Sequence, residues 1–278
     1  MCLAYEIAQG AYRHSSYEKF VVNDNKRRLI AVAAVRDRVV HRLLYEYLVQ
    51  RYDKMFVYDA WSCRPRKGID GAISRVQQHM RAYRDGWLWR SDIRKFFDHV
   101  DHEVLLELIS RRVTGSRAIW LMRTVVESYD AGKQAGLAIG NLTSQICANI
   151  YMHEYDRFVA HELHPLGYVR YGDDMVLWAS NEQKARDFAD KSQEFLARVL
   201  HLAINPQSTV LQPACRKLHY LGVEFWPSGH RLDARMRSRL VKNVGMANYA
   251  SYDALARSRS ARTDLQAIRQ RMLESSNQ

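Results

Sequence analysis

Three aspartates stand where the sequence could hold divalent metal ions. Asp173 and Asp174 end the run Tyr-Gly-Asp-Asp at 171–174, between two apolar stretches, and Gly-Asp in that setting predicts the tight turn of a β-hairpin. Asp92 closes an earlier apolar stretch with the pattern of a strand. Carboxylates at the ends of neighbouring strands suit two Mg²⁺ ions and phosphoryl transfer. Taken singly, an Asp-Asp pair is typical of a solvated turn, and Asp92 is typical of a helix cap or a salt bridge. The surrounding elements therefore decide between these roles and a metal site.

The composition favours a folded protein with a polyanionic partner. The chain has 278 residues, 47% of them hydrophobic and 26% charged, which suits one large domain or two to three subdomains that share a core. The formal net charge of +12 indicates nucleic acid first and an anionic membrane second. A basic protein without such a partner is the remaining alternative.

The cysteines and the N-terminus indicate a cytoplasmic protein. No two cysteines form a Cys-x-x-Cys pair and none has histidine at zinc-finger spacing, so we expect reduced thiols that pack mostly as small apolar residues. The first residues lack the pattern of a signal peptide, and no stretch approaches the roughly 18 apolar residues of a membrane helix. We therefore expect no membrane partner. The cysteines are Cys2, Cys63, Cys147 and Cys215.

Hydrophobic periodicity predicts a long helix within residues 29–49, with one apolar face in the core and Asp37 and Arg38 on the solvent side. The residues expected in that core stripe are Val35, Val39, Val40, Leu43, Leu44, Tyr47 and Leu48.

Downstream, strands and helices alternate without βαβ spacing, which predicts an α+β fold with an antiparallel sheet. Asp101 has the residue type and position of a helix N-cap, and Gly136 and Gly140 flank a loop. The expected elements are a strand at 87–92, helices at 141–162 and 182–200, a hairpin at 168–178, a strand pair ending at 220–225 and a basic helical tail from 231.

The order of these motifs resembles the reverse transcriptases. Residues 91–102 resemble their first catalytic motif, 136–149 their second and 171–174 their third. Residues 221–225 resemble the primer-grip hairpin, and 26–30, 37–40 and 63–68 resemble the fingers, so the likeness runs from about residue 5 to 230. The resemblance implies a right-hand polymerase with fingers at 1–85, a palm at 86–228 with an insertion near 103–135, and a short basic helical thumb at 229–278.

The resemblance also assigns roles to individual residues. Asp92, Asp173 and Asp174 would be catalytic and, with the carbonyl of Ile93, would bind two Mg²⁺ ions, for which Mn²⁺ could substitute. A guanidinium at Arg27 offers a planar fork of donors to the incoming triphosphate. The residues expected to bind nucleotide are Arg27, Arg64, Lys67, Phe97, Ile139 and Gly140, and those expected to bind nucleic acid are Ser144, Gln145, Tyr171, Leu221, Gly222, Arg235 and Arg239.

Some of these roles have alternatives. Arg64 and Lys67 could equally contact the template backbone, and Phe97 could be core packing beside Phe96. The resemblance places Phe97 at the position where an aromatic ring in this family blocks a ribose 2′-hydroxyl. A ring at this position favours deoxynucleotides. Viral RNA-dependent RNA polymerases, which share the Gly-Asp-Asp run, have an aspartate there.

The second motif favours a subfamily. Ile139-Gly140 and Ser144-Gln145 replace the usual Gln-Gly and Ser-Pro, a variant that resembles the reverse transcriptases of diversity-generating retroelements. In those enzymes an aliphatic residue at the Ile139 position accompanies misincorporation opposite adenine. A group II intron-like or phage-defence reverse transcriptase is the alternative, disfavoured for the intron type by Ser144-Gln145 and by the lack of a maturase extension after residue 278. An inactive RNA-binding polymerase scaffold is a third reading.

The implied partners are a template RNA, a primer or cDNA strand, deoxynucleotides and a small basic accessory protein, in a bacterial, phage or plasmid-borne element. One departure from the family concerns its fourth motif, where Ser208 or Gln207 takes the place of a lysine and Lys217 or Arg216 is a candidate substitute. His99 and His102 are expected to serve the loop and the helix cap rather than a metal.

Overall fold

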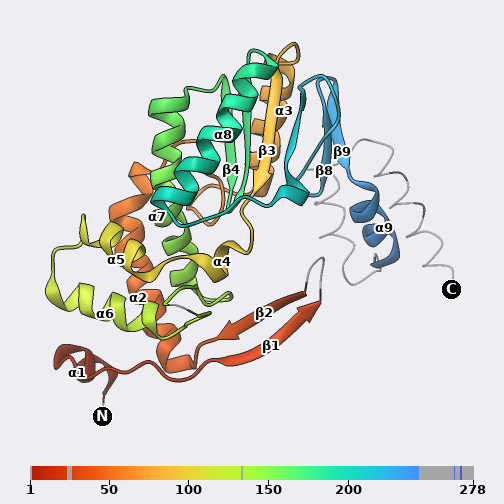
Figure 1. Cartoon of the computed structure of the whole chain (residues 1–278). Helices are drawn as coiled ribbons and strands as arrows, with labels where there is room; N and C mark the ends of the chain where they lie inside the picture. Colours follow the sequence, from red (N-terminus) through yellow and green to blue (C-terminus); the bar gives the residue numbers. More distant parts are fainter. Residues whose placement is uncertain (1, 24–26, 133, 244–265, 267–269, 271–278) are drawn as a thin grey trace.

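The structure, a computed structural model, describes residues 2–23, 27–132 and 134–243, together with residues 266 and 270 (Figure 1). It confirms the α+β prediction. Its centre is a four-stranded antiparallel sheet in the order β4-β5-β3-β6. The strands are β3 (Trp87–Asp92), β4 (Gly167–Tyr171), β5 (Asp174–Ala179) and β6 (Val210–Pro213).

Helices cover both faces of this sheet because alternate strand residues are apolar on both sides. Trp89 and Leu177 pack into the larger core with α7 (Leu142–Phe158) and α8 (Glu182–Val199). Leu88, Val176 and Trp178 face the other way, into a second core with α3 (Ile69–Ala82). The sheet ends that carry Asp92 and Asp174 are therefore held by packing on both sides.

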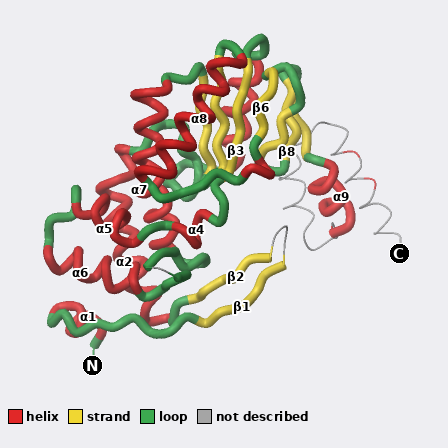
Figure 2. The backbone as a smooth tube through the Cα atoms, viewed as in Figure 1, coloured by secondary structure: helices red, strands yellow, loops and turns green. Residues whose placement is uncertain are grey.

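The described chain has two smaller sheets, one beside the central sheet and one apart from it (Figure 2). β7 (Leu218–Tyr220), β8 (Val223–Trp226) and β9 (Gly229–Leu232) share the second core and lead into α9 (Ala234–Asn243). The hairpin of β1 (Glu18–Asn23) and β2 (Arg27–Val32) projects from the helical part of the molecule. The thumb predicted as helical at 229–278 begins with the strand β9, so its first four residues are not helical. Apart from residues 266 and 270, its part beyond residue 243 lies outside the described chain, and the division into fingers, palm and thumb stays a prediction.

The remaining elements surround the hairpin and the larger core. They are α1 (Leu3–Ala8), α2 (Val35–Tyr52), the 3₁₀ turns η1 (Asp53–Met55) and η3 (Pro206–Ser208), α4 (Phe96–His99), α5 (His102–Ser110), α6 (Ser116–Glu127) and a π-helical turn, η2 (Val159–Leu163), that continues α7. The helix expected at 141–162 is thus confirmed as α7 with η2. Asp101 caps α5 as predicted, since its Oδ1 accepts from the Val104 amide at 3.0 Å.

The expectation for residues 29–49 is wrong in two respects. Residues 27–32 form β2, and the helix begins at Val35. Three residues of the expected core stripe, Val35, Val39 and Leu43, are exposed, whereas Asp37 is fully buried. Asp37 accepts hydrogen bonds from the Tyr12 hydroxyl and the Ser15 amide, two groups far away in sequence. The stripe that packs inward is Val40, Leu44 and Leu48 together with Asp37, His41 and Tyr52.

The packing expected of the cysteines holds only for Cys147. Cys147 is buried and burial raises the pKa of its thiol to about 12, whereas Cys2, Cys63 and Cys215 are exposed. All four are free thiols. Among the residues that the structure describes, no helix is both long and apolar enough to cross a membrane.

Candidate active site

The carboxylates gather at one end of the central sheet. Asp92, the last residue of β3, lies directly opposite Asp174, the first residue of β5, and Asp173 occupies the turn between β4 and β5. Directly opposed residues in an antiparallel pair have Cβ atoms roughly 4.5–5.5 Å apart. Gly172 makes the turn with φ of +66°, which suits glycine. The predicted hairpin is confirmed, and it brings together residues that the sequence separates.

Arg90 holds one of the three carboxylates. Its Nε and Nη2 donate to Oδ1 and Oδ2 of Asp174 at 3.0 and 2.7 Å, and both side chains are less than a fifth exposed. Burial raises the pKa of Asp174 to about 6; the bonds from Arg90 oppose that rise, and the charges of Asp173 and Asp92 add to it. Sequence reasoning missed Arg90, although its position two residues before Asp92 places both on the same face of β3.

Ser208 contacts the second carboxylate. Its hydroxyl donates to Oδ1 of Asp92, and the Asn205 amide donates to the backbone oxygen of Asp92 at 2.9 Å. Ser208 is one of the two residues expected in place of the family's fourth-motif lysine, and it brings a neutral hydroxyl to Asp92. Lys217, a candidate substitute, makes an ion pair with Glu224 at 3.0 Å.

A buried arginine supports the turn from behind. Arg170 of β4 is 1% exposed and donates to both carboxylate oxygens of Asp156 on α7, at 2.7 and 2.6 Å. Its Nη1 also donates to the Gly172 carbonyl at 2.8 Å and to Asn149 Oδ1 at 3.3 Å. Arg170 thus joins α7 to the turn, and the position of Asp173 in that turn depends on α7.

The donor chemistry of this site fits Mg²⁺, which prefers carboxylate oxygens. The described part of the chain contains no group of three or more His, Cys, Asp or Glu side chains already placed around one point. Since Arg90 engages Asp174, Asp92 and Asp173 are the carboxylates best suited to hold metal. His99 and His102 bond backbone carbonyls, of Lys95 and Gly136, in keeping with their expected structural roles.

The residues expected to bind nucleotide lie in different settings. Arg27, the first residue of β2, is exposed. Arg64 uses four of its five N–H donors on protein acceptors, namely the Asp53 side chain and the carbonyls of Asp53, Val57 and Ala60, which favours a structural role. Lys67 donates to the Tyr58 carbonyl, and its Nζ lies 3.8 Å from the centre of the Trp61 ring.

The second motif, residues 136–149, runs from a loop that contacts β2 into the first half of α7. The Ile139 carbonyl accepts from the Ala31 amide of β2 at 3.0 Å, and Gly140 has φ of +112° with Ile30 close by. Ile139 itself is half-buried. Ser144 is buried and donates to the Ala138 carbonyl, whereas Gln145 is exposed. Phe97 is half-buried, with its ring centre 5.3 Å from that of Phe96.

The remaining predicted residues lie on the second core and α9. Tyr171 and Leu221 pack against that core, and Leu221 and Gly222 make the β7–β8 turn with φ of +53° and +75°. Tyr220 ties this turn to the carboxylates, because its hydroxyl donates to the Asp174 backbone oxygen at 2.9 Å. Arg235 and Arg239 lie exposed on α9.

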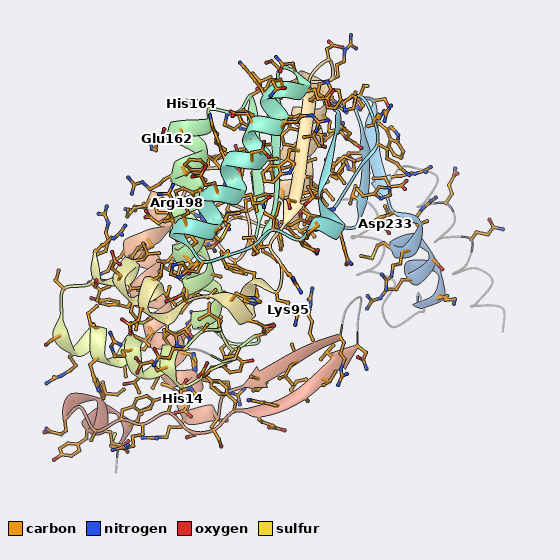
Figure 3. The ribbon with its side chains drawn as sticks, viewed as in Figure 1. His14, Lys95, Glu162, His164, Arg198 and Asp233 are labelled. Atoms are coloured by element: carbon orange, nitrogen blue, oxygen red, sulfur yellow. The ribbon has the colours of Figure 1, made fainter. Side chains whose placement is uncertain are left out.

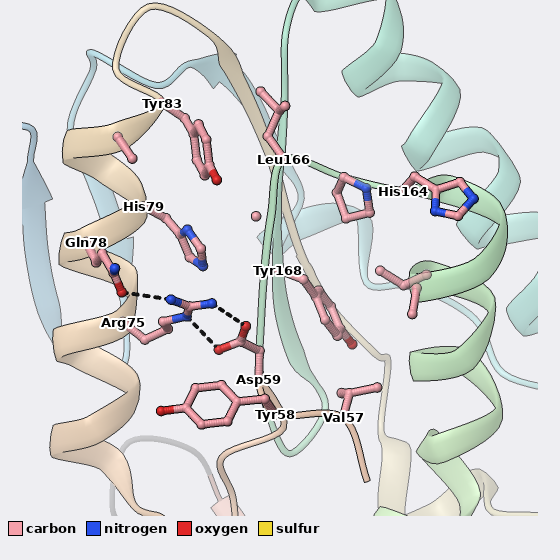
Figure 4. Close-up of a pocket in the computed structure, with 15 residues that line it drawn as sticks. Val57, Tyr58, Asp59, Arg75, Gln78, His79, Tyr83, His164, Leu166 and Tyr168 are labelled. Atoms are coloured by element: carbon pink, nitrogen blue, oxygen red, sulfur yellow. Dashed lines mark hydrogen bonds and ion pairs between the residues drawn. The ribbon is translucent and has the colours of Figure 1, made fainter. Parts of the chain in front are cut away.

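A pocket of about 440 Å³ lies away from the carboxylates, at the opposite end of β4 (Figure 4). In it Arg75 makes a bidentate ion pair with Asp59 at 2.8 and 2.9 Å, and His79 packs against Gly167. The charges of Arg75 and Asp59 in this pocket thus neutralise each other.

Comparison with known proteins supports the resemblance of the motifs. The sequence profile of the family "Reverse transcriptase (RNA-dependent DNA polymerase)" matches residues 19–225. Protein YkfC of Escherichia coli is 24% identical over 195 residues, 66% of this chain and 50% of that protein. The group II intron-encoded protein LtrA of Lactococcus lactis is 27% identical over 143 residues, 49% of this chain and 24% of LtrA. The chain spans half or less of the length of these relatives.

Solved structures show the same fold. The apo telomerase of Candida tropicalis has a TM-score of 0.65 at 12% identity, over 95% of this chain and 58% of that one. A Candida albicans telomerase in complex with a fragment of telomeric RNA has a TM-score of 0.60 at 10% identity, over 97% and 58%. With the profile match over most of its length and the carboxylates grouped at the hairpin, the chain belongs to the reverse transcriptase (RNA-dependent DNA polymerase) family.

Proposed function

We propose that the chain is an RNA-directed DNA polymerase that copies a template RNA into cDNA from deoxynucleotides. The observation that carries this proposal is the pairing of Asp92 with Asp174 across β3 and β5, with Asp173 in the adjoining turn. A protein that only bound RNA would gain nothing from three carboxylates at the same end of a sheet, because they repel each other and the phosphates.

The chain's own residues have distinct tasks in this reaction. Mg²⁺ held by Asp92 and Asp173, with the Ile93 carbonyl, would supply charge neutralisation of the triphosphate and a more acidic primer 3′-hydroxyl. Ser208 fixes the Asp92 carboxylate, and Arg90 fixes and neutralises Asp174. Exposed Arg27 on the hairpin would bind the triphosphate.

Primer extension on an RNA template tests the proposal. The wild-type chain is compared with Asp173→Asn, with Mg²⁺ and either deoxynucleotides or ribonucleotides. We expect extension with deoxynucleotides only and its loss in Asp173→Asn, with thermal melting showing that the variant folds. Extension that survives in Asp173→Asn would overturn the site, and no extension with Mg²⁺ or Mn²⁺ would favour the RNA-binding scaffold. Ribonucleotide incorporation would favour an RNA polymerase.

We further infer low fidelity from Ile139. Its backbone is held by Ala31, so its side chain stays at the junction of β2 and α7. An aliphatic side chain contacts a nascent base pair without the orienting hydrogen bonds that an amide would make. Gap filling opposite template adenine should therefore be more accurate in Ile139→Gln than in the wild type. Equal error rates would contradict the inference.

The biological setting is proposed on two grounds that differ. The Ile139-Gly140 and Ser144-Gln145 variant supports a diversity-generating retroelement, with a small basic accessory protein as partner. The likeness to an intron-encoded protein supports a group II intron-like relative. A template repeat and a variable-protein gene beside the coding sequence would favour the diversity-generating retroelement.

A further inference from the structure

A second pocket, of about 460 Å³, is lined by residues of α2, α5 and α7 and of the segments that follow them. These helices lie in the helical part of the molecule (Figure 1). Its lining includes apolar side chains such as Leu108 and Ile150, and it shares no residue with the carboxylate turn. We call it the α5–α7 pocket. Its basic side chains are Arg111, Arg112, His153, Arg157 and His161.

Helical spacing builds the basic wall. His153, Arg157 and His161 follow one another every four residues along α7 and η2, so they lie on one face. Arg111 and Arg112 extend from the end of α5. That end is fixed to α2, because the Tyr52 hydroxyl donates to the carbonyls of Leu108 and Ile109 at 3.1 and 3.0 Å.

The positive charge of the pocket is only partly balanced. Glu154 is the one carboxylate in the lining, and it contacts Arg111 and Arg157 at 3.4 and 3.7 Å, distances long for charged hydrogen bonds. Within the described chain, the Arg112 guanidinium makes no ion pair or side-chain hydrogen bond. Arg111 also pairs, through its Nη2, with Glu107 outside the lining at 3.0 Å. Three guanidiniums against two carboxylates leave an excess of one positive charge that an anion would neutralise.

A buried polar atom also lacks a partner in this lining. His153 is 7% exposed, and its Nδ1 has no hydrogen-bond partner among the described residues. Burial lowers the pKa of His153, so the ring is neutral at pH 7 and has one nitrogen able to donate. A phosphate oxygen in the pocket would accept that bond.

We propose that the α5–α7 pocket binds a phosphodiester of the template RNA, away from the site of nucleotide addition. The proposal rests on the proposed use of RNA as template, and arginine forks around a phosphate are how proteins position a nucleic-acid backbone. The pocket is remote from the reaction: Asn149, which contacts Arg170 behind the turn, precedes Arg157 on α7 by two turns, or about 12 Å.

Fluorescence anisotropy over a range of salt concentrations tests this. Two labelled RNAs serve as probes. One is a stem–loop with a long single-stranded arm, and the other is the same stem–loop without the arm. The pocket variant carries Arg112→Ala with Arg157→Ala. The matched control carries Arg186→Ala with Arg198→Ala on α8, where both arginines are more than half exposed (Figure 3 labels Arg198). Melting curves check the folding of each.

We expect the pocket variant to bind the long RNA more weakly, with a slope of log K against log salt that is lower by about 2, whereas the control keeps its slope. Glu154→Gln, which removes the competing carboxylate, should bind the long RNA more tightly. Equal losses in the pocket and control variants, or weaker binding by Glu154→Gln, would overturn the proposal. Asp173→Asn keeps the two proposals apart: it should bind the long RNA like the wild type even where it cannot extend a primer.

Discussion

At the scale of single residues, Asp174 and Asp92 contact different partners, and these partners give the two carboxylates different roles. Arg90 makes Asp174 part of a nearly buried ion pair, whereas Asp92 accepts a hydrogen bond from the neutral Ser208 hydroxyl. The contact with Ser208 brings no positive charge to Asp92, which suits a carboxylate proposed to bind metal. The same view makes Asp174 a residue that shapes the turn, with its catalytic role a proposal.

This division predicts a specific stability cycle. Arg90→Leu leaves the Asp174 charge buried beside Asp92 and Asp173, so we expect a loss of about 3 kcal/mol in the free energy of unfolding. Adding Asp174→Leu removes the uncompensated charge and should restore much of that loss. Urea unfolding of the two single variants and the double variant measures the coupling. Additive losses would show that the pair does not interact.

His79 predicts how stability depends on pH. Burial lowers the pKa of His79 to about 4, with Arg75 adding to the effect, and its Nε2 has no partner among the described residues. In the unfolded chain His79 takes up a proton near pH 6.5, whereas in the folded chain it does so only near pH 4. The free energy of unfolding therefore falls as the pH drops from 6.5 to 4. The loss amounts to about 2 kcal/mol at pH 5.

His79→Phe should lose that share of the pH dependence while keeping a ring against Tyr83 and Trp178. Urea unfolding at pH 7.5 and pH 5 gives the difference for each protein. A matched control, His164→Asn, changes an exposed histidine whose left-handed backbone, with φ of +48°, asparagine tolerates, and it should leave the difference unaltered. An unchanged difference in His79→Phe would contradict the assignment.

At the scale of elements, the local features were predictable and the long-range ones were not. The hairpin at 168–178 and the Asp101 cap follow from short-range turn and capping chemistry, and both are present. The bonds from Arg90 to Asp174 and from Ser208 to Asp92 join residues 84 and 116 positions apart, so no local pattern indicates them. The burial of Asp37 likewise depends on Tyr12, which only the folded chain brings near.

The turn that carries Asp173 predicts a graded mutational effect. A Cβ added at Gly172 would meet no atom closer than 3.9 Å, so the penalty of a side chain there comes from its positive φ alone. We expect Gly172→Ala to destabilise by about 1–2 kcal/mol and to slow primer extension, because the turn would shift Asp173. Asparagine tolerates this backbone region better, so Gly172→Asn should cost less. Equal effects of alanine and asparagine would argue against backbone strain as the cause.

At the scale of the whole molecule, the net charge of +12 does not by itself locate a binding surface, because any basic surface attracts nucleic acid. The positions of the individual arginines are needed for that. Arg235 and Arg239 lie one helical turn apart on α9, which follows the sheet whose Tyr220 contacts the Asp174 backbone. They follow directly in the chain after the sheet that contacts the reaction site, unlike the exposed arginines of α8.

Charge placement therefore predicts a difference between two variants of equal net charge. Replacing Arg235 and Arg239 with glutamine should weaken binding of a short RNA–DNA duplex and lower the salt slope by about 2, since two phosphate contacts are lost. The same change at Arg186 and Arg198 should leave the slope near that of the wild type, because those side chains already pair with Glu182 and Glu194. Anisotropy titrations with the short duplex measure both. If the two variants lose the same affinity, the effect is that of net charge, and α9 has no special contact with the duplex.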